Sequence, residues 1–142
     1  MKLELSYNFL DHATDAIIEV TAKNLKEAFA VTADAVINLT LDQDKVEEKD
    51  QKEFSAKGKD LRYLLFSWIE EITFVLITEG FAIKRIEFDI KEDNGYQITA
   101  KAYGELLDFH KHNFKVEIKA PTFYEMEIRE DKGIFMRFLL DL

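Results

Sequence analysis

The sequence predicts an α+β fold, with a single domain over residues 1–142 in which a largely antiparallel β-sheet carries two helices on one face. Two segments have apolar residues at helical spacing, several shorter runs alternate apolar and polar residues, and turn-forming residues separate those runs. A length of 142 residues with 47% apolar content is typical of one domain with one core.

The two helices are expected over about residues 25–39 and 61–78. The first has apolar residues at i, i+3, i+4 and i+7, and Asn24 is placed to cap its start. The second is apolar on more than one side, which indicates a central position in the fold. Asp60 is placed to cap the start of this helix, and Gly80 to end it in a left-handed conformation.

Strands account for most of the remaining chain. Asn94 and Gly95 form a hairpin turn signal because both residue types tolerate positive φ, and Gly133 marks another turn. The order of strand, helix, strand, helix and then a run of strands is typical of an α+β domain with mainly antiparallel pairing. The alternating runs that predict strands are residues 15–21, 53–57, 86–90, 96–102, 114–120, 124–128 and 134–140.

The composition excludes several functions. With 28 acidic and 19 basic residues, the net charge is −9, and we expect no strong direct binding to nucleic acid because that affinity comes from Lys and Arg. A role in an RNA pathway would therefore act through a partner protein. The absence of Cys excludes thiolate metal sites and Cys nucleophiles. The absence of a long apolar run or a signal-peptide core favours a cytoplasmic protein without a membrane span.

The first candidate site is the segment of residues 11–15. Asp11 and Asp15 offer hard oxygen ligands, and His12 offers a nitrogen ligand or a proton carrier. These three residues would suit a metal-dependent hydrolase, but no GxSxG, HExxH or Gly-rich phosphate loop accompanies them. Spacing alone favours turn chemistry at the start of a strand.

The second candidate site is the end of the last strand, where Asp141 is followed by the terminal carboxylate of Leu142. A divalent cation would relieve the repulsion between these groups, and ligation by carboxylates favours Ca²⁺ or Mg²⁺ over Zn²⁺. The alternative is a frayed, solvated end.

Two further groups of polar residues have a structural and a functional interpretation. Lys115 and Lys119, on the polar face of the run 114–120, would contact a phosphate or a partner's acid, or else form cross-strand ion pairs. His110 and His112 are interpreted as the surface of a loop, because no third nitrogen ligand is evident.

Several segments, in order along nearly the whole chain, resemble the archease family. They are residues 11–15, similar to the family's acid-His-Thr-Ala-Asp motif, then 24–29, 60–68, 78–81, 101–105 with 111–112, 117–124, and the ending 140–142. Ala13 and Thr14 are exchanged relative to the family motif, and Pro121 and Phe123 replace the usual Ile and Tyr. These departures leave Asp15 and Asp141 in place.

The resemblance implies an accessory protein rather than an enzyme. Archeases assist the GTP-dependent RNA ligase of tRNA splicing and RNA repair by promoting its guanylylation and repeated turnover. Carried over, the family's calcium ligands are Asp15, Asp141 and Leu142, with Mg²⁺ or Mn²⁺ as alternative hard cations, and its functional lysine is Lys119. Two alternatives stay open: a chaperone-like modulator of a tRNA-modifying enzyme such as a methyltransferase, and a structural interaction module without metal.

Overall fold

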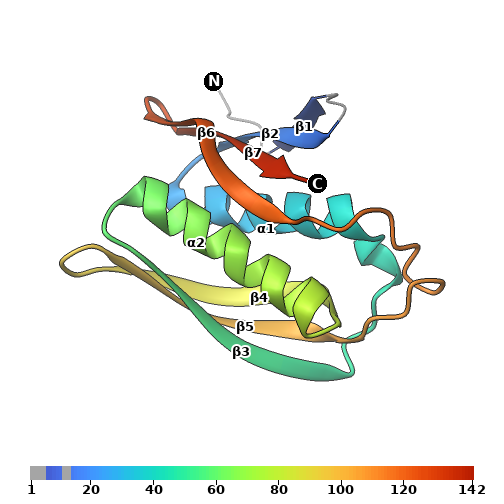
Figure 1. Cartoon of the computed structure of the whole chain (residues 1–142). Helices are drawn as coiled ribbons and strands as arrows, with labels where there is room; N and C mark the ends of the chain where they lie inside the picture. The colour runs from blue at the N-terminus through green and yellow to red at the C-terminus, as the bar shows by residue number, and fades with distance from the viewer. Residues whose placement is uncertain (1–5, 11–13) are drawn as a thin grey trace.

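The strands form two antiparallel sheets, and the helices lie between them (Figure 1). The computed structural model describes residues 6–10 and 14–142. Sheet A has the strand order β1-β2-β7-β6, and sheet B has the order β3-β5-β4. The elements are β1 (Ser6–Leu10), β2 (Asp15–Ala22), α1 (Leu25–Thr40), η1 (Gln43–Lys45), β3 (Asp50–Gly58), α2 (Leu61–Thr73), η2 (Phe74–Thr78), β4 (Phe81–Glu92), β5 (Tyr96–Leu106), β6 (Ala120–Glu130) and β7 (Ile134–Asp141). The prediction of an α+β fold with antiparallel strands is confirmed, but the strands form two sheets instead of the one expected, and each sheet packs one face on the helices.

The helix boundaries follow from their caps. The Asn24 side chain accepts a hydrogen bond from the Glu27 amide at 2.9 Å, and Asp60 accepts one from the Tyr63 amide at 3.0 Å, as expected. Gly80 has the left-handed φ of 61° that ends the second helix. The predicted helix over 61–78 changes character near its end, because α2 continues into the π-helical turn η2. Within residues 6–10 and 14–142, neither helix has the length and apolar character needed to cross a membrane.

Trp68 on α2 ties the helices to sheet B. Its indole N–H donates to the Phe29 carbonyl oxygen of α1 at 2.9 Å, and its ring is fully buried. The rings of Phe54 on β3 and Phe88 on β4 lie 5.7 and 4.9 Å from the Trp68 ring, centroid to centroid. Burial of aromatic rings is a large contribution to stability, so this cluster fixes α2 over sheet B.

The prediction of a strand over residues 114–120 was wrong. The segment passes the end of α1, where the Lys115 amide donates to the Thr40 carbonyl oxygen at 2.8 Å. A carbonyl in the last turn of a helix lacks an intrahelical partner, and this bond satisfies it in place of a strand ladder. Pairing begins at Ala120, and Pro121 is tolerated because β6 is an edge strand. The strand β1 was not predicted.

Candidate metal centre

Asp15 and Asp141 lie directly opposite each other on the neighbouring strands β2 and β7. The Leu142 amide donates to the Thr14 carbonyl oxygen at 3.2 Å, so the next pair along, 14 with 142, is the hydrogen-bonded one. Asp15 and Asp141 are therefore a non-hydrogen-bonded pair, in which Cα atoms of an antiparallel ladder approach to about 4.5 Å. Side chains of such a pair point to the same face of the sheet and are close together.

These two acids point away from the core. Ala16, Ile18 and Val20 are buried along β2, and the alternation of a strand turns Asp15 to the outer face, where it is half-buried. Asp141 is exposed and follows the fully buried Leu140. The outer face of sheet A therefore carries two close carboxylates at its end.

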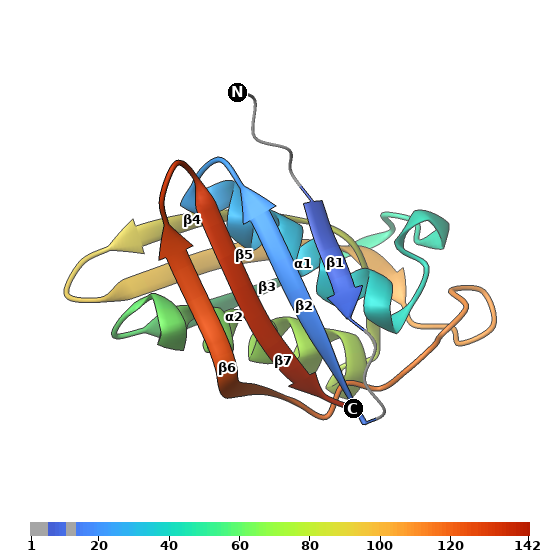
Figure 2. The same ribbon diagram turned by 90° about the horizontal axis from the view of Figure 1, so that it is seen from above.

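Lys119 and Leu142 lie at the same end of sheet A. The Lys119 amide donates to the Asp141 carbonyl oxygen at 2.8 Å, and the Lys119 side chain is exposed. Leu142 packs against the core, which holds its main chain beside the start of β2 (Figure 2). The fold thus brings together Asp15, Lys119, Asp141 and Leu142. Asp11 and His12, which complete the predicted set, lie outside the described residues.

The donors at this sheet end fit a hard cation. Two carboxylates and main-chain oxygens of Leu142 are the oxygen ligands that Ca²⁺ and Mg²⁺ prefer, and such a set favours these ions over Zn²⁺, which prefers nitrogen and sulfur. Over residues 6–10 and 14–142, no cluster of three or more His, Asp or Glu side chains is arranged to hold a metal. In the described part of the chain, Asp15 and Asp141 are the two side chains at this sheet end that could hold a cation.

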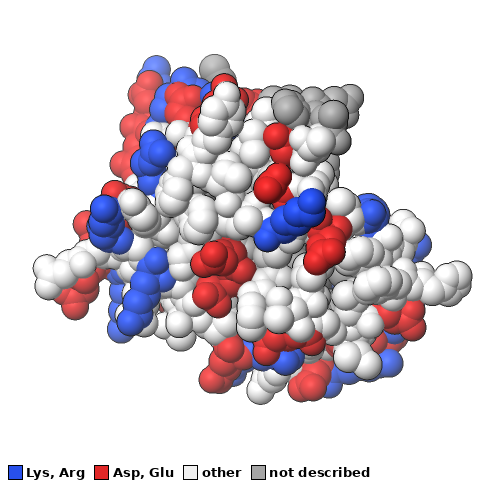
Figure 3. Space-filling model, in the orientation of Figure 1, with Lys and Arg blue, Asp and Glu red and all other residues white. Residues whose placement is uncertain are grey.

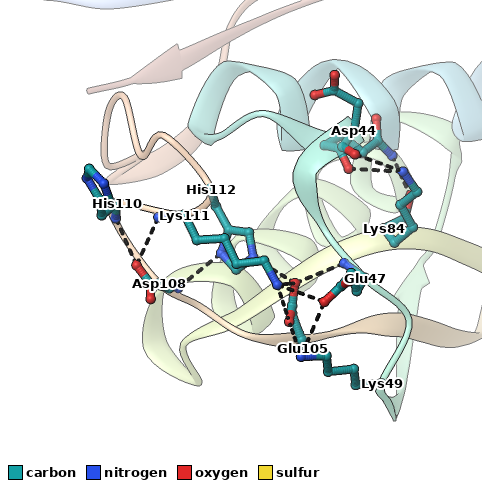
Figure 4. Close-up of polar contacts among 10 residues, drawn as sticks. Asp44, Glu47, Lys49, Lys84, Glu105, Asp108, His110, Lys111 and His112 are labelled. Carbon is teal, nitrogen blue, oxygen red and sulfur yellow. Dashed lines mark hydrogen bonds and ion pairs between the residues drawn. The ribbon is translucent and has the colours of Figure 1, made fainter.

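A second polar cluster joins the end of β5 to the loop that follows it (Figure 4). The Glu105 carboxylate lies 2.9 Å from His112 Nε2, accepts a hydrogen bond from the Glu47 amide at 2.9 Å, and pairs with Lys111 Nζ at 2.9 Å. Lys49 Nζ lies 3.6 Å from the same carboxylate. The His112 side chain is fully buried and that of Glu105 is 9% exposed. We call these five residues the Glu105 cluster.

Hydrogen bonds fix the protonation of this cluster. The Asp108 amide donates to His112 Nδ1 at 3.0 Å, so Nδ1 accepts and the Nε2–H donates to Glu105. The bond from His112, followed by those from Glu47 and Lys111, lowers the pKa of Glu105 to about 2. The cluster is therefore a neutral histidine on an ionised carboxylate, with two lysines at its exposed edge.

The interpretation of His112 as loop surface was wrong. His110 is exposed, but His112 is fully buried, because Glu105 and the Asp108 amide satisfy both ring nitrogens. Sequence reasoning also missed Glu105, which is 7% exposed. The single available signal was that residues 101–105 and 111–112 resemble one family stretch, which did not reveal that the two parts contact each other.

The chain is thus a small α+β protein that places Asp15, Asp141 and Lys119 together at one end of sheet A. The model of the Archease protein family matches residues 7–142. The protein archease of Pyrobaculum neutrophilum is 36% identical over 96% of this chain and 95% of its own length. That of Pyrobaculum islandicum is 38% identical, covering 97% of this chain and 96% of its own. The solution structure of Methanobacterium thermoautotrophicum protein 1598 superposes with a TM-score of 0.78 at 31% identity, covering 96% of this chain and 99% of that one.

The chain belongs to the archease family, an accessory-protein family. The resemblance drawn from the sequence is therefore confirmed at the level of family and fold.

Proposed function

We propose that this protein activates the GTP-dependent RNA ligase of tRNA splicing and RNA repair, promoting guanylylation of the ligase and its multiple turnover. The observation that carries the proposal is the close pair of Asp15 and Asp141 beside Lys119. Surface acids next to an exposed lysine suit a protein that acts on a partner's active site.

In this proposal, Asp15, Asp141 and main-chain oxygens of Leu142 hold Ca²⁺, with Mg²⁺ or Mn²⁺ as alternatives. A bound cation would neutralise the two carboxylates and supply positive charge for phosphate oxygens. Lys119 offers an ammonium group for the same phosphates. Asp11 and His12, which precede Asp15 in the sequence, are proposed to contact the partner next to the cation.

The negative charge of the chain favours binding to a basic partner protein. The net charge of −9 favours association with a protein that itself binds RNA, because such a protein is positively charged. Activation requires that this protein bind the guanylylated ligase, or the transition state of guanylylation, more tightly than it binds the unmodified ligase.

The test is multiple-turnover RNA ligation with this protein at a small fraction of the ligase concentration. The unaltered chain should raise ligase guanylylation and turnover, and Asp15→Ala, Asp141→Ala and Lys119→Ala should each lose most of that increase. Asp89→Ala is the matched control, because it removes the same charge from an exposed position on sheet B. Full activation by the Asp15→Ala and Asp141→Ala variants would contradict the proposal.

A pull-down from cell extract with this chain as bait distinguishes between the candidate partner proteins. Recovery of an RNA ligase supports the proposal. Recovery of a tRNA methyltransferase without the ligase would instead support the chaperone-like role.

A further inference from the structure

A cavity of about 340 Å³ adjoins Lys119, between the end of the second helix and the segment that leads into β6. From the helix side it is lined by Glu70, Thr73 and Phe74, and from the other side by Glu117, Lys119 and Pro121. In Figure 3, acidic side chains gather around basic ones on this face, below the end of β7. The cavity shares Lys119 with the candidate metal centre but uses a different set of side chains.

The Thr73 hydroxyl is the unusual group in this cavity. The residue is 8% exposed, and its Oγ1 has no hydrogen-bond partner among the described residues. The two other buried helical threonines donate to the carbonyl four residues earlier, Thr32 to Ala28 at 2.8 Å and Thr40 to Val36 at 3.1 Å. Thr73 directly precedes the π-helical turn η2, and π-turns inside helices often mark functional sites. A buried hydroxyl without a partner is costly, so a ligand that hydrogen-bonds to it gains affinity.

The surroundings of Thr73 favour a cation. Glu70 and Glu117 place two carboxylates at the exposed rim, against the one ammonium of Lys119. The carbonyl end of the second helix adds partial negative charge to the same place. The pKa of the adjacent Glu71 is raised by burial and by the charges of Glu70 and Glu79, which indicates a negative potential along this helix.

The ring of Phe74 narrows the choice of cation. It is 49% exposed, although the residues on either side of it, Thr73 and Val75, are buried. An aromatic face beside carboxylates binds a planar guanidinium by stacking and by cation–π attraction, and a guanidinium has five N–H donors for a carboxylate and a hydroxyl together.

We propose that this cavity receives an arginine side chain from a basic partner protein, with the guanidinium stacked on Phe74, paired with Glu70 or Glu117, and donating to Thr73 Oγ1. The identity of the protein that presents the arginine rests on the proposed function, whereas the preference for arginine does not. The arginine would anchor the partner next to Lys119 and so set how it meets Asp15 and Asp141.

The experiment is an NMR titration of the full chain with blocked peptides of the form Gly-Arg-Gly, and with matched peptides in which citrulline or lysine replaces arginine. The arginine peptide should shift the amide resonances of residues 70–78 and 117–121, and the neutral citrulline peptide should not. Thr73→Val keeps the shape of the side chain and removes the hydroxyl, so it should weaken arginine binding roughly tenfold, as expected for a hydrogen bond to a charged group.

A stability measurement excludes a purely structural role for the hydroxyl. If Thr73 Oγ1 has no partner, Thr73→Val should leave the melting temperature unchanged or raise it. A lower melting temperature with unchanged arginine binding would overturn the proposal, as would equal binding of the citrulline or lysine peptide. Asp89→Ala is the control, and it should bind the arginine peptide like the unaltered chain.

The two proposals fail separately. If the arginine peptide binds at Thr73 but the chain does not activate a ligase, the proposed function is wrong and the arginine site stands. If ligase activation depends on Asp15 and Asp141 while the arginine peptide does not bind, the arginine site is wrong.

Discussion

The carboxylates of the Glu105 cluster and those at the end of sheet A have opposite surroundings. In the Glu105 cluster, His112, Lys111 and a backbone amide surround one carboxylate, and its pKa falls to about 2. At the sheet end, the register places Asp15 and Asp141 side by side, and like charges directly opposite each other in a sheet are destabilising. The first region therefore stabilises the fold, whereas the repulsion between the two acids of the second region opposes folding, as expected if they form the proposed cation site.

The largest effect is expected in the Glu105 cluster. Glu105→Ala removes the acceptor of the buried His112 Nε2–H and of the Glu47 amide, and should lower the free energy of unfolding by about 3 kcal/mol. Urea denaturation measures this loss. Glu105→Gln is the control: it keeps an acceptor and should lose less. A loss below about 1 kcal/mol for Glu105→Ala would show that the cluster does not stabilise the fold.

Acid should affect the same region next. The folded-state pKa of Glu105 is lowered to about 2, and that of Asp42, bonded to Lys115, is also lowered to about 2. Since the unfolded chain binds these protons first, stability should fall as the pH drops from about 4.5 towards 2. Denaturation at a series of pH values should give a shallower fall for Glu105→Gln. If stability falls equally steeply for this variant and the unaltered chain, Glu105 does not cause the loss of stability in acid.

A divalent cation should act on the sheet end and leave the cluster unchanged. Ca²⁺ at about ten times its dissociation constant should raise the free energy of unfolding by about 1.4 kcal/mol, because the ligand binds the folded state. Thermal unfolding with Ca²⁺ and with a chelator measures this shift. Glu105→Gln should retain the shift and Asp15→Asn should lose it. An unchanged melting temperature at a high Ca²⁺ concentration would contradict the proposal that the folded chain binds Ca²⁺.

The smallest effect has the opposite sign. Without a divalent cation, Asp141→Asn should raise the free energy of unfolding by roughly 0.2–1 kcal/mol, since it relieves repulsion across the ladder. With Ca²⁺ the variant should lose this advantage. Denaturation in the presence of a chelator tests the first part, with Asp89→Asn on sheet B as the control. A clear loss of stability for Asp141→Asn in chelator would show that Asp141 does not destabilise the end of sheet A.

The sequence predicted the local features well, because each depends on a few neighbouring residues. The caps at Asn24 and Asp60 and the turn at Gly95 need only their own hydrogen bonds and φ angles, and all three were confirmed. The strand expected over 114–120 failed because a regular alternation does not reveal that α1 offers its last carbonyls to this segment.

The sequence by itself determined the fold class, the family and the identity of the acids near the two ends of the chain. Tertiary structure decided which distant residues meet: the register of β2 on β7 placed Asp15 against Asp141, and the loop after β5 folded back to bury His112 on Glu105. Such contacts join residues that are far apart in the sequence, 126 positions in the Asp15–Asp141 pair. Composition and periodicity record the environment of each residue, whereas pairing across the sheet depends on the packing of the whole chain.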